Sequence, residues 1–280
     1  MTTHRLPTYF ISHGGGPWPY MDDLRKKLRV LEVSLKDIPR QIAVVPKAVL
    51  VISGHWEEDE FTVMANPHPP MVYDYSGFPE HTYHVKYPAP GSPQLAQRVR
   101  SLIEAAGMPA RLDPQQGFDH GTFTPLVIMY PEADVPVVEL SMKSGYDPAV
   151  HLKVGEALAP LRDEGVLIIA SGNIIHNLAH YRQSEGTRPD WALDFQARSN
   201  AAILSGDHDA LTGIAPDDRA AALAINSGEH FLPLLYTLGS RQPGDGVALF
   251  NDTVDGALSM TSVLIGDPSL LHALEQTLAV

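Results

Sequence analysis

The sequence contains no cysteine among its 280 residues. This absence excludes disulfide bonds, iron–sulfur clusters, thiolate-ligated haem and cysteine nucleophiles. Any bound metal must therefore be held by nitrogen and oxygen atoms, a donor set that suits iron(II), zinc or manganese. Basic residues are also few, 20 against 33 acidic ones, and the resulting net charge of −13 argues against a nucleic-acid partner.

Long hydrophobic runs are absent as well. No apolar stretch approaches the roughly 20 residues of a membrane-spanning helix, and the amino terminus lacks the pattern of a secretory signal. We therefore expect a cytoplasmic protein with no membrane partner. No repeat, low-complexity tract or linker divides the chain, and its length suits one large domain. The sequence thus predicts a single catalytic domain over residues 1–280.

Histidines follow the apolar runs that the sequence does contain. Three such runs each precede a histidine: 8–12 precedes His13, 48–53 precedes His55, and 166–170 precedes His176. Uninterrupted apolar runs of this length are typical of strands covered on both faces of a parallel sheet. The sequence therefore predicts an α/β fold, with a central, mostly parallel sheet flanked by helices. In such sheets the reactive crevice lies beyond the carboxyl ends of the strands, so we expect the active site there.

Two of these histidines are candidate metal ligands from their context alone. His13 and His55 each follow a strand and each lie beside glycine, which leaves the imidazole room to turn into the crevice. Metal sites favour neutral imidazoles on rigid elements. The alternative is two buried histidines that hydrogen-bond to backbone carbonyls. Glu229 and His230 begin a predicted helix, 229–238, and either could be a further ligand.

The remaining histidines carry less information. His176 and His180 have the i, i+4 spacing of a helical zinc site, but Asn177 stands where a metalloprotease needs glutamate. That function is therefore disfavoured, and His180 is expected to be incidental. His120 lies in 116–126, which reads as a polar loop. The histidines expected on the surface with no special role are His4, His68, His151, His208 and His272.

Residues 66–91 are rich in proline, tyrosine and histidine and cannot form a regular helix. Long irregular segments inside compact domains are usually functional lids or linkers. Tyr75 and its neighbours favour an ordered lid that lines an aromatic pocket, and the alternative is a small apolar cluster under a surface loop. Helices are predicted over 21–35, from the spacing of Leu24, Leu28 and Leu31, and over 92–107, where Ser92 is the N-cap.

Six motifs, in order, resemble one known family. They are SHGGGP at 12–17, GHWE at 54–57, GFP with YPAPG between 77 and 91, DHGTF at 119–123, SGNIIHNL at 171–178 and EHFLPLL at 229–235. Together they are similar to the class III extradiol ring-cleavage dioxygenases, in the branch of the 4,5-DOPA dioxygenases. The resemblance covers roughly residues 8 to 265.

This resemblance implies a mononuclear non-haem metal, most often iron(II), with zinc in some members of the branch. It implies that His13, His55 and His230 are ligands and that His176 is an acid–base residue, close enough to be a fourth ligand in a zinc-loaded form. His120 becomes a proton donor that faces the substrate. The implied reaction cleaves the ring of a substituted catechol with O₂ and gives a semialdehyde.

Two positions depart from the wider family. Related dioxygenases outside this branch use a carboxylate as third ligand, so the choice between His230 and Glu229 stays open. Relatives often have tryptophan where this chain has Phe123, which alters the pocket wall beside the substrate. The competing hypotheses are a zinc-dependent hydrolase that uses the same histidines with metal-bound water, and a non-catalytic metal-binding relative. The catechol substituent and the existence of a homo-oligomer are left open.

Overall fold

The computed structural model describes residues 5–270 except residues 43, 146, 216 and 268. Within these residues an eight-stranded sheet forms the centre of the molecule, in the order β4-β3-β5-β2-β6-β1-β10-β7. Its strands are β1 (Thr8–Ile11), β2 (Ala48–Glu58), β3 (Phe61–Met64), β4 (Ala110–Asp113), β5 (Val137–Lys143), β6 (Val166–Ser171), β7 (Gly246–Phe250) and β10 (Ser262–Gly266). A separate hairpin pairs β8 (Val254–Asp255) with β9 (Leu258–Ser259).

The middle of the sheet is parallel, as the apolar runs predict. Strands β5, β2, β6 and β1 lie side by side and point the same way, and antiparallel pairs occur between β3 and β5 and at β10. Ser171 at the end of β6 is in register with both Ile11 and Ser53. The carboxyl ends of β1, β6 and β2 therefore meet at one edge, which is where the three strand-terminal histidines were expected to gather.

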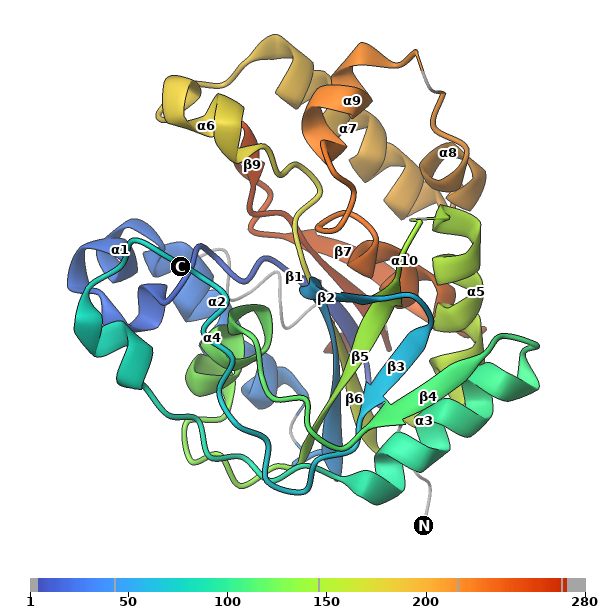
Figure 1. Ribbon diagram of the computed structural model, residues 1–280. Helices are drawn as coiled ribbons and strands as arrows, with labels where there is room; N and C mark the ends of the chain where they lie inside the picture. Colours follow the sequence, from blue (N-terminus) through green and yellow to red (C-terminus); the bar gives the residue numbers. More distant parts are fainter. Residues whose placement is uncertain (1–4, 43, 146, 216, 268, 271–280) are drawn as a thin grey trace.

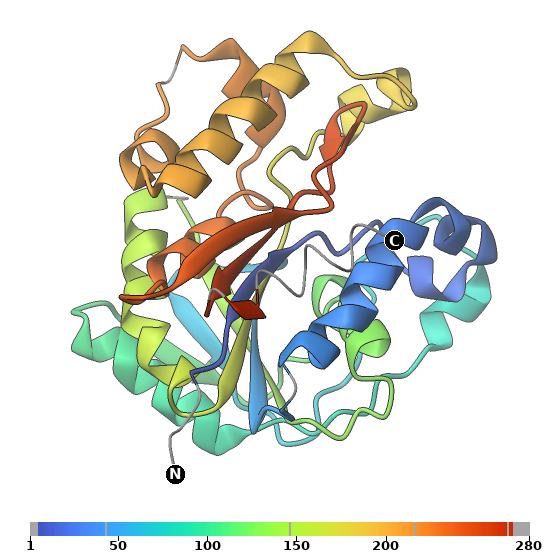
Figure 2. The same cartoon turned by 180° about the vertical axis from the view of Figure 1, so that it is seen from behind.

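Helices cover both faces of the sheet (Figures 1 and 2). On one face α3, α5 and α10 pack against the larger apolar core, and on the other α2 and α4 pack against a second core. The α-helices are α1 (Asp22–Lys27), α2 (Arg29–Ile42), α3 (Pro93–Ala105), α4 (His120–Met129), α5 (Pro148–Leu158), α6 (Leu178–Ser184), α7 (Asp190–Ser205), α8 (His208–Thr212), α9 (Arg219–Ile225) and α10 (Pro233–Gly239). Short 3₁₀ helices are η1 (Trp18–Tyr20), η2 (Glu80–His84) and η3 (Ala159–Arg162).

One helix agrees closely with its sequence signals and another does not. Ser92 caps α3 by accepting a hydrogen bond from the Leu95 amide, as expected. The helix predicted over 21–35 is instead two helices, because Leu28 leaves helical geometry between α1 and α2. The second of them continues to Ile42 through Pro39, since its buried stripe of apolar residues does not stop at position 35.

The loop predicted over 116–126 is wrong in its second half, because α4 begins at His120. Asp119 caps this helix through its side chain, which accepts from the Thr122 amide at 3.0 Å. Apart from Val127 and Ile128, which are partly exposed, α4 is buried on all sides. Its sequence therefore has no amphipathic periodicity, and Gly121 and Pro125 are residues that disfavour a helix.

No helix in the described part of the chain is both long enough and apolar enough to cross a membrane.

Candidate metal centre

His13 is held at the end of β1 by contacts to its backbone and its ring. Its carbonyl oxygen accepts a hydrogen bond from Trp18 Nε1 at 2.7 Å. Its Nδ1 lies 2.9 Å from Ser171 Oγ. Because that hydroxyl already donates its single proton to the Gly121 carbonyl, it must accept from His13 Nδ1–H. The lone pair of the ring is therefore on Nε2.

His55 lies within β2 rather than after it, which corrects the expectation that the strand ends at residue 53. The pairing of β2 with β5 shifts between Ile52 and Glu57, and such irregularities re-aim side chains at functional edges of sheets. His55 is turned so that its Nδ1 lies 3.2 Å from a carboxylate oxygen of Asp74. An ionised carboxylate only accepts, so Nδ1 carries the proton and Nε2 the lone pair.

His230 lies in the turn before α10, and the predicted helix over 229–238 begins only at Pro233. Its carbonyl oxygen accepts from the Asn173 amide at 2.8 Å. A side chain at Gly172 would collide with this backbone, and one at Gly54 would press tightly against it, so the two glycines ease the approach of the turn to the strand ends. Glu229 Oε1 lies 3.0 Å from His230 Nδ1, which again leaves the lone pair on Nε2.

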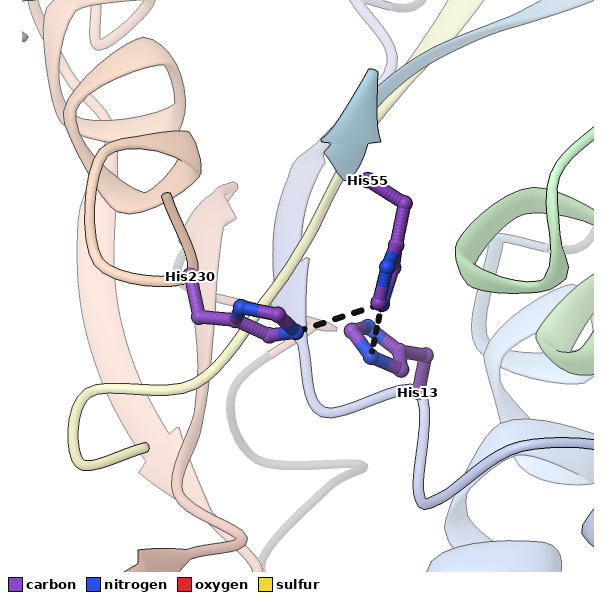
Figure 3. A group of neighbouring side chains, drawn as sticks. All are labelled: His13, His55 and His230. Carbon is purple, nitrogen blue, oxygen red and sulfur yellow. Dashed lines mark hydrogen bonds between the residues drawn. The ribbon is translucent and has the colours of Figure 1, made fainter. Parts of the chain in front are cut away.

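The three Nε2 atoms converge on one point (Figure 3). His55 Nε2 lies 3.1 Å from that of His13 and 3.2 Å from that of His230. Three lone pairs that face one another repel unless a cation lies among them. Nitrogens about 2.1 Å from a common metal ion are separated by about 3.0–3.4 Å at octahedral to tetrahedral angles. The donor set therefore fits a metal ion, and each ring has an outer partner that fixes its orientation.

Burial keeps these rings neutral, which is the form that binds a metal. Desolvation, followed by the neighbouring imidazoles, lowers the pKa of His13 and His55 well below the ordinary value of a histidine. Desolvation also lowers the pKa of His230 to about 4, although Glu229 opposes this effect. A cluster of buried neutral imidazoles at a sheet edge is typical of a metal site.

His176 lies beside this group rather than among its three converging nitrogens. Its ring stacks on that of His230 with centroids 3.5 Å apart and an angle of 12° between the planes. Its Nδ1 is 3.7 Å from Glu229 Oε1. Asn177 caps α6, so His176 precedes the helix and shares no helical face with His180. The i, i+4 pattern is therefore not a helical zinc site.

His120 lies at the first position of α4, against the His55 ring at a centroid distance of 3.9 Å. Its Nδ1 is 2.8 Å from Asp74 Oδ2, and its backbone amide donates to Asp74 Oδ1 at 3.0 Å. The sequence analysis missed Asp74 as a site residue. Its signal was weak: it is one carboxylate within an aromatic, proline-rich run.

The aromatic loop, residues 66–91, is ordered and braced by its own tyrosines. Tyr75 Oη donates to the Thr82 carbonyl at 2.6 Å, and its ring lies 5.7 Å from that of His120 and 6.4 Å from that of Phe123. Phe123 has no exposed surface, so it supports Tyr75 from behind. His84 faces away and pairs with Glu80. The loop is therefore both an aromatic cluster and a wall next to the candidate metal centre.

A pair of buried carboxyl groups lies behind His120. Asp119 Oδ1 accepts from Ser53 Oγ at 2.8 Å, and the charge of Asp119 acts on Glu139, whose side chain is completely buried. Burial, reinforced by the Asp119 charge, raises the pKa of Glu139 well above its ordinary value. Glu139 is therefore the protonated member of the pair, and Asp119 is held as the cap of α4 by Ser53 and the Thr122 amide. Glu57, the last residue of the GHWE motif, is exposed.

Comparison with known proteins places this geometry in context. Residues 7–247 match the family described as the catalytic LigB subunit of aromatic ring-opening dioxygenase. The chain is 38% identical over 258 residues to a 4,5-DOPA dioxygenase extradiol of Beta vulgaris, a match that covers 90% of this chain and 92% of the relative. It is 37% identical over 275 residues to the protein of the same name in Escherichia coli, covering 95% and 97%.

Two further similarities extend the comparison. A dioxygenase of Hapsidospora irregularis, tasH, is 33% identical over 264 residues, covering 88% of this chain and 81% of its own. The crystal structure of an uncharacterized protein from Escherichia coli K12 superposes with a TM-score of 0.77 at 34% identity, covering 94% of this chain and all of the other. The fold and most of the chain length are thus shared with these proteins.

Proposed function

Because the chain belongs to the family of the catalytic LigB subunit of aromatic ring-opening dioxygenases and is an extradiol dioxygenase, we propose that it opens the ring of a substituted catechol. The product would be a semialdehyde that contains both atoms of O₂. The observation that carries the proposal is the convergence of the Nε2 atoms of His13, His55 and His230 on one point. His230, rather than Glu229, is the proposed third ligand, because Glu229 is already the partner of His230 Nδ1.

Iron(II) is the proposed native metal, and zinc is the metal expected to compete for the same histidines. Three neutral imidazoles suit either ion. When bound, iron(II) supplies open coordination positions and a redox partner through which a catecholate and O₂ can react, whereas zinc has no redox chemistry. A permanent fourth ligand would occupy one of those positions, so His176 is proposed as an acid–base residue and not as a constant ligand.

His176 is the proposed general base that takes a proton from a catechol hydroxyl. It stacks on His230 and is partly exposed, so it borders the proposed ligand set without entering it. General-base assistance of this kind typically contributes ~10²–10⁴ in rate. His120 is the proposed residue that returns a proton to oxygen from the opposite side, where its ring contacts His55 and its Nδ1 is held by Asp74.

Tyr75 is the proposed contact for the substrate ring, with Phe123 as its support. The Tyr75 hydroxyl is already bonded to Thr82, so the tyrosine offers its ring and not a hydrogen bond. Aromatic rings pack edge-to-face or offset against one another, which suits recognition of a planar diol. This aromatic wall favours a catechol that carries a substituent. The substituent itself is to be identified by experiment.

The direct test is oxygen consumption by protein reconstituted anaerobically with iron(II). We expect one O₂ to be consumed per catechol, with a yellow ring-opened product, for at least one member of a panel of substituted catechols. Activity of the zinc form towards esters or amides without oxygen, together with no O₂ uptake by the iron form, would instead support a hydrolase.

His176→Ala tests the role of the base. We expect it to retain iron but to lose ~10²–10⁴ in kcat, because only the proton transfer is removed. The matched control is His180→Ala, four residues along the chain and outside the site, which should retain both metal and turnover. Loss of iron from His176→Ala would show that His176 is a ligand and would contradict this assignment.

A further inference from the structure

The start of the aromatic loop runs alongside the segment that leads into α4. Phe118 N–H donates to the Pro70 carbonyl at 2.9 Å, and Val72 N–H donates to the Phe118 carbonyl at 2.8 Å. A side chain at Gly117 would collide with the Pro70 carbonyl, so this close approach requires glycine. The pairing fixes the loop two residues before Asp74 and places that carboxylate beside the beginning of α4.

The Asp74 carboxylate accepts two hydrogen bonds from His120 and lies within ion-pair distance of the His55 ring. Its Oδ1 accepts from the His120 backbone amide at 3.0 Å, and its Oδ2 lies 2.8 Å from His120 Nδ1 and 3.2 Å from His55 Nδ1. The side chain is 19% exposed, so these contacts are largely shielded from solvent. One carboxylate on the loop therefore meets both a proposed metal ligand and the proposed proton donor.

We propose that Asp74 is a positioning residue that holds His55 and His120 together, each with Nδ1–H towards the loop and Nε2 towards the reaction site. The assignment of His120 to turnover rests on the function proposed above, whereas the orientation of the two rings does not. Through this contact the aromatic loop controls the proposed metal centre: a loop that moves away withdraws the acceptor from both histidines. Tyr75, the next residue, packs on the His120 ring and reinforces the same placement.

Acceptor counting explains why a carboxylate is needed. An ionised aspartate presents two oxygens and no donor, so it can satisfy three N–H groups at once. Asparagine presents one oxygen and an NH₂ group, so in Asp74→Asn at least one of these N–H groups faces another donor. The least costly relief is for His120 or His55 to move its proton to Nε2 or to turn its ring. For His55 either change removes the lone pair that faces the other ligand nitrogens, and for His120 it releases the ring from its fixed orientation.

The experiment compares wild type, Asp74→Asn, Asp74→Glu and the control Glu80→Gln. Glu80 lies on the same loop, but its carboxylate pairs only with the exposed His84, so the control removes a loop charge without touching the site. The first readout is long-range proton–nitrogen NMR of the zinc-loaded proteins, with His120 and His55 resonances assigned by single substitutions. We expect Nδ1–H on both rings in wild type and in Glu80→Gln, and loss of that pattern on at least one ring in Asp74→Asn.

The second readout is zinc affinity, and the third is steady-state oxygen uptake with iron(II). Loss of an outer partner of a metal-binding histidine typically weakens metal binding 10- to 100-fold, so we expect about that change in Asp74→Asn. We expect kcat to fall while KM for the catechol changes little, because the contacts of the Asp74 carboxylate are to His55 and His120. Asp74→Glu, which keeps two acceptor oxygens, should recover part of the affinity and of the NMR pattern.

The outcomes separate this inference from the proposed function. Unchanged tautomers and unchanged zinc affinity in Asp74→Asn would overturn the positioning role, whatever the enzyme does with catechols. If wild type consumed no O₂ with any catechol while Asp74→Asn still altered the rings and the zinc affinity, the proposed substrate would fail and the positioning role would stand. Should Asp74→Asn not fold, Asp74→Ser takes its place: a variant that keeps the wild-type NMR pattern and zinc affinity overturns the role, and one that loses both while Asp74→Glu recovers part of them supports it.

Discussion

Two buried histidines, one after β1 and one in α5, have closely similar surroundings but different consequences. His13 and His151 are both almost completely buried. Each has its Nδ1 within 2.9 Å of a hydroxyl oxygen, that of Ser171 for His13 and that of Tyr236 for His151. Burial lowers the pKa of both, to about 4 for His151. Neither burial, neutrality nor one hydrogen bond therefore distinguishes His13, a proposed metal ligand, from a structural histidine.

The second nitrogen of each ring distinguishes them. The ring of His151 also hydrogen-bonds to the backbone of Lys143, so its polar atoms are satisfied inside the protein. In His13 the hydroxyl of Ser171 is committed to Gly121, and Nε2 faces the nitrogens of two other histidines. The useful criterion is thus whether the lone pair of a buried ring nitrogen has a hydrogen-bond donor as its partner. Where several such lone pairs converge with no hydrogen-bond donor among them, a cation is the partner that the geometry indicates.

The strongest test of this contrast removes each ring in turn. Zinc at roughly 100 times its Kd should stabilise wild type by about 2.7 kcal/mol. We expect the same stabilisation by zinc in His151→Phe, which keeps the volume of the ring but loses its hydrogen bonds. We expect no stabilisation by zinc in His13→Ala. Denaturant unfolding with and without zinc, together with metal analysis, measures the effect. Full zinc stabilisation of His13→Ala would end the assignment of His13 as a ligand.

His151 also shows what could not be predicted from the sequence. It was expected on the surface, because nothing in its local sequence indicates that it is covered. The strand-terminal histidines were found because parallel strands end at one edge, which is a property of chain order. Asp74 was missed for a different reason: its role depends on the pairing of residues 70–72 with 117–118, a contact that no local pattern encodes.

Local signals were nevertheless informative where one interaction dominates. Ser92 and Pro93 predicted the start of α3 correctly, since a capping hydroxyl and a proline at the first turn act on their own backbone. The same kind of signal at Asp119 was present but was outweighed by Gly121 and Pro125, two residues that disfavour helix. Tertiary burial of α4 overrides that preference. Propensity is therefore a weaker guide to the site than strand order.

A second test of the contrast uses pH. The folded-state pKa of His151, about 4, lies below the ordinary value of 6.5, so the folded protein binds fewer protons than the unfolded chain between these values. Stability should therefore be lost as pH falls below 6.5, by about 1.4 kcal/mol per unit. Between pH 7.5 and pH 5 this amounts to roughly 2 kcal/mol from His151 alone.

His151→Gln isolates that contribution, because glutamine can hydrogen-bond to Tyr236 but does not titrate. Urea unfolding of both zinc-loaded proteins at the two pH values should show a loss of stability that is roughly 2 kcal/mol smaller in the variant. The other histidines titrate in both proteins and cancel in the difference. Equal losses in the two proteins would mean that His151 is not the buried neutral group described above.

The smallest effect on zinc affinity is expected at Glu229, the hydrogen-bond partner of His230 Nδ1. Glu229→Gln keeps one oxygen that can accept from His230 Nδ1–H, so the ring should hold its orientation and zinc affinity should fall only about tenfold. Glu229→Leu removes the acceptor and should approach the upper end of the range, about 100-fold. If Glu229 were itself the third ligand, both variants would instead lose the metal, and His230→Ala would keep it. Zinc titration of these three proteins therefore decides which of two adjacent residues binds the metal and which one orients its neighbour.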